Sequence, residues 1–123
     1  MNRFEGRLER NFGRKLIEFK FNGTEYEVRC TEHSLERFKE RNINIDEALG
    51  SIVALGKERL DYFSGQGSDV AIIDKQNHIS VIITFESEEH YVQIRIATII
   101  DRDNIVVKDG TKIFCLKNYK GGF

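Results

Sequence analysis

The sequence has no proline, only two cysteines and no long apolar run, and each shortage excludes a class of protein. Without proline, turns and helix ends must be identified from glycine, asparagine and aspartate. Cys30 and Cys115 are too few for a disulfide framework, so we expect reduced thiols in an intracellular protein. The longest apolar stretches span only a few residues, such as VAII at 70–73. We therefore expect no membrane span, no signal peptide and a cytoplasmic location.

The chain also lacks a strong net charge, since its formal charge at pH 7 is −1. No global basic field therefore marks it as a nucleic-acid-binding protein. Its 40 % hydrophobic and 32 % charged residues are typical of a soluble globular protein. The 123 residues fit one domain, which we divide into an N-terminal helix or arm at 1–14 and a core at 15–118.

Basic residues are nevertheless concentrated at the N-terminus. Phe4, Leu8 and Phe12 are four residues apart, which is the spacing of an amphipathic helix. Four arginines accompany this apolar stripe: Arg3, Arg7, Arg10 and Arg14. The segment either folds back onto the domain or is a docking helix, in which case the arginines contact an acidic partner or RNA phosphate.

The next 42 or so residues contain a hairpin and two helices. Asn22-Gly23 joins two alternating arms within 15–30, as in a two-residue β-hairpin. Thr31 is a suitable N-cap for a helix that reaches about residue 41. A second helix starts at Asn44 or Asp46 and ends near Gly56.

The remaining chain is interpreted as strands separated by short turns. They cover 58–63, 69–74, 78–86 and 90–101, and a last pair covers 104–107 and 112–117. Short gaps favour antiparallel neighbours. We therefore predict an α+β fold, in which two helices pack on a four-stranded antiparallel meander and an N-terminal helix and β-hairpin are added.

Three bases on the first long helix raise the question of function. At 100° per residue, His33, Arg37 and Arg41 share one helical face, opposite Leu35 and Phe38. A histidine is suited to proton transfer at neutral pH. The simpler alternative is a solvated surface, on which neighbouring glutamates pair with the arginines.

The segment 31–43, TEHSLERFKERNI, resembles the opening helix of small bacterial proteins related to BrnT and, more distantly, to RelE. The likeness covers roughly 29–101. Asn42 stands where that family favours glycine, and this difference is mild because asparagine also tolerates positive φ. These proteins are toxin ribonucleases of toxin–antitoxin pairs. The resemblance therefore implies a metal-independent endoribonuclease without cofactor, an RNA substrate and a cognate antitoxin that covers the sheet face.

Such chemistry needs a base, an acid and cations near the scissile phosphate. Alternation in 91–98 places Tyr91, Gln93 and Arg95 on one side, where antiparallel pairing brings them beside Thr84 and Glu86. The resemblance implies that such groups gather on the sheet face and the nearby helix. The predicted catalytic residues are His33, Arg37, Tyr91 and Arg95. The predicted RNA contacts are Arg41, Gln93, Arg3, Arg7, Arg10 and Arg14. Polar alternation on a half-exposed strand is, however, also ordinary.

Other interpretations remain open. Cys30 and His33 have a zinc-ligand spacing that Cys115, His78 or His90 would have to complete, and we expect no metal. The chain can instead be a non-catalytic protein-binding module of phage or mobile-element origin. An RNA-binding domain without cleavage is a third possibility. The oligomeric state is left open.

Overall fold

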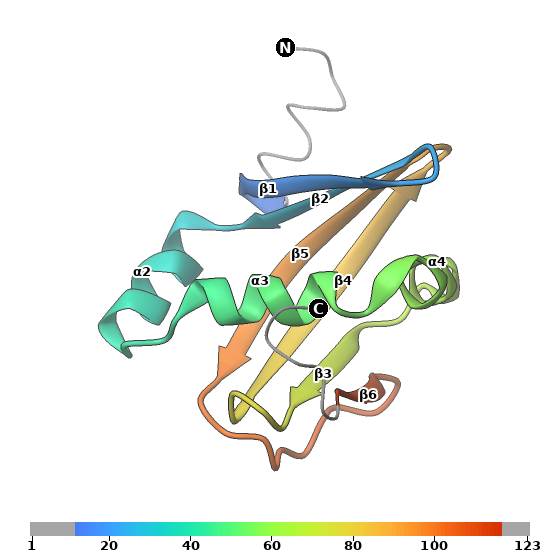
Figure 1. Cartoon of the computed structure of the whole chain (residues 1–123). Helices are drawn as coiled ribbons and strands as arrows, with labels where there is room; N and C mark the ends of the chain where they lie inside the picture. Colours follow the sequence, from blue (N-terminus) through green and yellow to red (C-terminus); the bar gives the residue numbers. More distant parts are fainter. Residues whose placement is uncertain (1–11, 117–123) are drawn as a thin grey trace.

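The computed structural model describes residues 12–116 of the chain. Their order is β1 (Arg14–Phe21), β2 (Thr24–Cys30), α2 (Glu32–Glu40), α3 (Ile45–Val53), α4 (Gly56–Gln66), β3 (Val70–Asp74), β4 (Ile79–Glu88), β5 (Tyr91–Ile100) and β6 (Lys112–Leu116). The strands form one sheet in the order β1-β2-β5-β4-β3-β6 (Figure 1).

The predicted four-stranded antiparallel meander with two helices is wrong, because the described residues form a six-stranded mixed sheet with three helices. The meander exists only as β3, β4 and β5. The hairpin extends this sheet because β2 pairs parallel to β5, and β6 extends the other edge by pairing parallel to β3. Parallel neighbours need long crossover connections, and the prediction had considered only short ones.

A second correction concerns 58–63, which we predicted as a strand and which lies in α4. Leu60 and Phe63 are the buried residues of this helix, and their spacing of three suits one helical face. Gly67 closes the helix in the left-handed conformation with φ 69°. The SGQGS stretch at 64–68 is therefore largely the last turn of this helix and its C-cap. Residues 104–107, predicted as a strand, have no regular structure.

Several local predictions are confirmed. Asn22 and Gly23 have φ values of 46° and 88° at the turn between β1 and β2, as that hairpin type requires. Thr31 caps α2 by accepting a hydrogen bond from the Ser34 backbone N–H at 3.2 Å. Asn44 caps α3 in the same way. Asn42 has φ 60°, so asparagine does adopt the left-handed conformation after α2.

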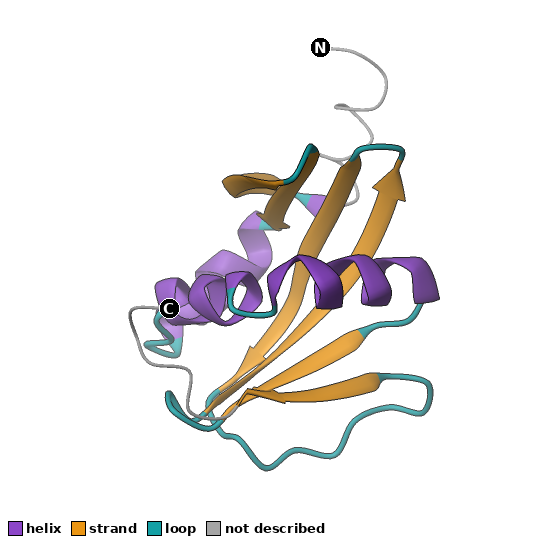
Figure 2. Cartoon of the chain, turned by 45° about the vertical axis from the view of Figure 1, so that its right-hand side comes forward, coloured by secondary structure: helices purple, strands orange, loops and turns teal. Residues whose placement is uncertain are grey.

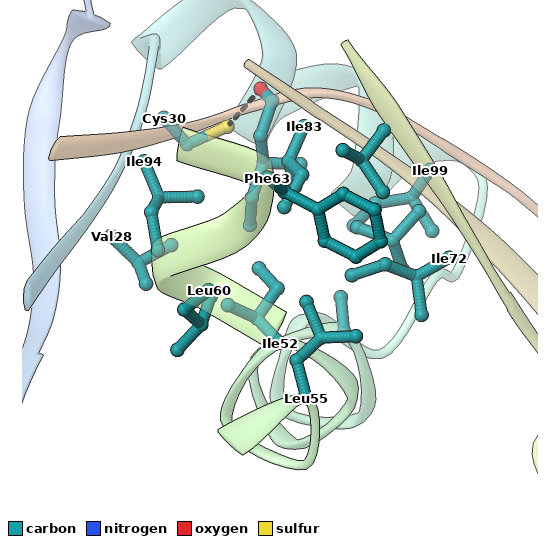
Figure 3. Packing of buried hydrophobic residues seen from close by; sticks show 14 of the residues in the cluster. Val28, Cys30, Ile52, Leu55, Leu60, Phe63, Ile72, Ile83, Ile94 and Ile99 are labelled. Carbon is teal, nitrogen blue, oxygen red and sulfur yellow. Dashed lines mark hydrogen bonds between the residues drawn. The ribbon is translucent and has the colours of Figure 1, made fainter. Parts of the chain in front are cut away.

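Helices α2, α3 and α4 cover one face of the sheet, as Figures 1 and 2 show. Phe38 of α2, Ile52 of α3 and Leu60 of α4 belong to one buried cluster with alternate strand residues. Figure 3 shows this packing, in which Val28, Ile94, Ile83 and Ile72 come from four neighbouring strands. Burial of such side chains stabilises the fold by about 1.5–3 kcal/mol each. The helix-covered face is therefore the hydrophobic core.

The opposite side of the sheet is here called the outer face. Side chains alternate along a strand, so the residues between the core positions lie on it. Near β3 and β6 the outer face is aliphatic and includes Ile73, Ile82 and Ile113. Toward the other end of β4 and β5 and on β2 it carries charged and amide side chains. This polar half contains the candidate site.

Candidate functional site

Six polar side chains from three neighbouring strands meet on the outer face. The strand register places Arg29 beside Arg95 and Glu27 beside Gln93 across β2 and β5. It places Thr84 beside Arg95 and Glu86 beside Gln93 across β4 and β5. Side chains of directly paired residues have Cβ atoms about 4.5–5.5 Å apart. We call this set the outer-face cluster: Glu27, Arg29, Thr84, Glu86, Gln93 and Arg95.

A buried ion pair lies within the outer-face cluster. The Arg29 Nε and Nη2 atoms donate to Glu27 Oε2 at 3.3 and 3.2 Å. Lys15 approaches the other carboxylate oxygen at 3.9 Å. Arg29 is 3 % exposed and Glu27 is 8 % exposed. Because removing charges from water is costly, this pair contributes little net stability compared with an apolar pair of the same size.

Residues 12 and 13 lie over the two arginines of this cluster. The Phe12 ring centroid is 5.7 Å from Arg95 Cζ, and the Gly13 carbonyl oxygen accepts from Arg29 Nη1 at 3.0 Å. Gly13 has φ +87°, and a Cβ there would lie 2.4 Å from the Cys30 carbonyl oxygen. Only glycine fits this close approach of two backbones. This contact between the backbones of Gly13 and Cys30 fixes the position at which β1 begins.

The structure brings together part of the predicted site. The predicted pairing of Arg95 and Gln93 with Thr84 and Glu86 is confirmed by the register of β4 and β5. Tyr91 shares that face, but it is four residues from Arg95, or about 13 Å along the strand. Tyr91 is 44 % exposed.

His33 does not join this group. Arg95 lies between Ile94 and Ile96, which are both in the helix-covered core, so its side chain leaves the sheet on the outer face. The helix that carries His33 packs on the core side through Phe38. The His33 side chain is exposed, and within 12–116 it makes no hydrogen bond or ion pair. The juxtaposition of His33 with Arg95, on which the predicted catalytic set depended, is therefore not formed.

The remaining predicted residues are dispersed. Arg37 lies on α2 and Arg41 is the C-cap of that helix, and both are exposed, as His33 is. Arg14 lies at the start of β1 and forms an exposed ion pair with Glu32 at 3.4 Å. Arg3, Arg7 and Arg10, together with most of the predicted 1–14 helix, lie outside the described residues.

Sequence reasoning missed Glu27 and Arg29. The alternation of TEYEVRC at 24–30 does place both on the side opposite Tyr26, Val28 and Cys30. That signal shows that the two residues share a face, but not which strand lies beside them. The parallel pairing with β5 is what makes them part of the candidate site.

A second group of polar side chains connects β2 to α4. The Tyr26 hydroxyl donates to Asp61 Oδ1 at 2.5 Å, and Lys57 contacts Asp61 Oδ2 at 2.6 Å. Burial raises the pKa of Tyr26, and the Asp61 carboxylate adds to that rise. Burial alone would raise the pKa of Asp61, but the hydrogen bonds from Lys57 and Tyr26 outweigh it and lower that pKa. These groups satisfy one another, so we assign them an anchoring role.

Within residues 12–116 no three His, Cys, Asp or Glu side chains are grouped as metal ligands. The Cys30 thiol is buried, and that burial raises its pKa from 9.0 to about 11. A thiol held protonated in this way is a poor nucleophile.

Among residues 12–116, no helix combines the length and apolar character that crossing a membrane requires.

The outer-face cluster thus combines carboxylates, two guanidinium groups and an amide over a short distance. Guanidinium groups bind phosphate oxygens, and carboxylates take up protons. No protein-family model, curated protein sequence or solved structure matches the chain. Function must therefore be inferred from the cluster itself.

Proposed function

We propose that this chain is a RelE/BrnT-like, metal-independent endoribonuclease whose reaction takes place at the outer-face cluster. The supporting observation is that Arg29 and Arg95 are neighbours across β2 and β5, with Glu27 and Glu86 beside them on the same face. In the proposed reaction, the 2′-oxygen attacks the adjacent phosphorus and the bond to the 5′-oxygen breaks. A solvent water protonates the 5′-oxygen as it leaves, so the products are a 2′,3′-cyclic phosphate and a 5′-hydroxyl.

Each residue has a defined role in this proposal. Arg29 and Arg95 bind the non-bridging phosphate oxygens and stabilise the negative charge of the phosphorane. Glu86, which the register of β4 and β5 places beside Gln93 on the same face, removes the 2′-hydroxyl proton. This assigns to a carboxylate the role that the sequence had assigned to His33. The proposed partner is an antitoxin that covers the same face.

The test is cleavage of a fluorophore-labelled RNA by the full chain in the presence of EDTA. We expect Arg95→Ala and Glu86→Gln each to lower the rate at least 100-fold. Loss of one donor to the transition-state charge costs about 10²–10³-fold, and a positioned acid–base group contributes about 10²–10⁴-fold. Lys39→Gln removes an exposed cation from α2 and serves as the matched control with an unchanged rate. A substrate with 2′-deoxyribose at the cleavage site should remain intact.

Two results would contradict the proposal. One is a wild-type preparation that cleaves no faster than a mock purification. The other is a rate that falls in His33→Ala but not in Arg95→Ala, since that result places the chemistry on α2.

Burial of the cluster favours a second candidate, a non-catalytic protein-binding module. Arg29 and Gln93 are 3 % and 1 % exposed, so RNA reaches them only if neighbouring atoms move. Two apolar residues are exposed: Val106, in the loop between β5 and β6, is 100 % exposed, and Ile113 of β6 is 56 % exposed. For this function we expect a stoichiometric protein partner that Ile113→Asp releases. Overexpression should leave growth unaffected.

A further inference from the structure

Gln93 has an unusual environment for an amide. It is 1 % exposed, and its Oε1 atom has no hydrogen-bond partner among residues 12–116. Buried polar atoms in native proteins nearly always have such a partner, so each exception requires an explanation. Ligand binding is one explanation, because a ligand donor would satisfy this oxygen.

The neighbours of Gln93 indicate what kind of ligand that is. Gln93 precedes Arg95 by two residues on β5, so both side chains lie on the outer face about 7 Å apart. If a phosphate binds at Arg95, the Gln93 amide is therefore close enough to contact the base of the same nucleotide. An amide presents a donor and an acceptor side by side, and the hydrogen-bonding edge of a nucleobase does the same.

We propose that Gln93 binds the edge of the base next to the phosphate held by Arg95 and so determines the base specificity of the site. This inference rests on the proposed function, which places the phosphate at Arg95. Phe12 covers Arg95 in the free protein at 5.7 Å, so its ring moves aside when the nucleotide enters. A Phe12→Ala variant therefore removes this ring from Arg95.

The test is titration of the ¹⁵N-labelled full chain with each of the four 3′-mononucleotides, in the wild-type and Phe12→Ala proteins. The Gln93 side-chain amide signal is assigned by its absence from Gln93→Ala. We expect this signal to shift and one nucleotide to bind at least tenfold more tightly than the weakest. In Gln93→Ala the four affinities should agree within twofold, while inorganic phosphate binds as before. In Gln93→Glu, which replaces a donor with an acceptor, the preferred base should change.

A thermal melt separates base recognition from a structural role. Gln93→Leu replaces an unpartnered amide with a hydrocarbon of similar size, so its unfolding midpoint should rise. A lower midpoint would show that the amide is already satisfied and would overturn the inference.

The outcomes also separate this inference from the proposed function. Base discrimination that persists in Gln93→Ala overturns the role of Gln93, whereas RNA cleavage that depends on Arg95 would still support the ribonuclease. If neither the wild-type nor the Phe12→Ala protein binds any nucleotide, and RNA is not cleaved, both proposals are contradicted.

Discussion

The two faces of the sheet differ in how they are buried. The helix-covered face holds aliphatic side chains such as Val28 and Ile94, both 0 % exposed, and needs no specific partners. The outer face buries Arg29 and Gln93 almost as completely, yet one is in an ion pair and the other has an unpartnered oxygen. Apolar residues would stabilise these positions equally well or better. Under the proposed function, ligand binding at the polar half of the outer face accounts for this difference, since burial of these groups adds little stability.

The largest expected effect comes from removing matched isoleucines from the two faces. Ile94→Ala leaves a cavity in the core and should lower the free energy of unfolding by about 2–5 kcal/mol. Ile113→Ala, on the outer face and 56 % exposed, should change it by less than about 0.5 kcal/mol. Urea denaturation of both variants gives the comparison. Similar losses would mean that the outer face around β6 is also a packed core.

The two cysteines allow the pH dependence of stability to be compared between the faces, since Cys30 lies in the core and Cys115 on the outer face. Because the pKa of Cys30 rises from 9.0 to about 11 on folding, its stabilising effect is complete below pH 9 and is lost as the pH rises through 11. This loss should amount to roughly 2–3 kcal/mol. Cys30→Ala should show a correspondingly flatter stability curve between pH 9 and 11. Cys115→Ala, whose thiol is exposed, should behave as the wild type.

The smallest expected difference comes from two glycines with nearly equal φ. Gly13 and Gly23 have φ of +87° and +88°, but only Gly13 would place a Cβ against backbone atoms. Gly23→Ala should cost about 1–2 kcal/mol through backbone strain alone. Gly13→Ala should cost about 1–3 kcal/mol more, because the two backbones must separate. Equal melting temperatures for the two variants would contradict the close approach at Gly13.

Local features of the fold were predictable from the sequence. The Asn22-Gly23 turn and the Thr31 cap follow from residues adjacent in the chain, and each is confirmed. The helix at 56–66 was not predicted, because its sequence fits two structures. The alternation in ERLDYF is compatible with a strand, and the spacing of Leu60 and Phe63, which are buried, is compatible with a helix. Its surroundings decide between the two.

The candidate site was predictable only in part for a related reason. Alternation along β5 indicated that Gln93 and Arg95 share a face, and the short turn before β5 indicated pairing with β4. No comparable local signal relates β2 to β5. The neighbours Glu27 and Arg29 therefore emerged only from the three-dimensional arrangement. The same limitation explains the misplaced His33, since the side of the sheet on which α2 packs is a tertiary property.

The parallel contact between β2 and β5 also bears on how the chain folds. Glu25 is aligned with Tyr91, 66 residues later in the chain. The hairpin of β1 and β2 therefore cannot pair with β5 until most of the polypeptide has been synthesised. Such distant pairing slows folding because a long loop must close first. During synthesis, therefore, the β2 edge remains available to other strands until β5 has left the ribosome. The bulge between Lys15 and Ile17 offers no protection there, because it lies on the opposite strand of the hairpin.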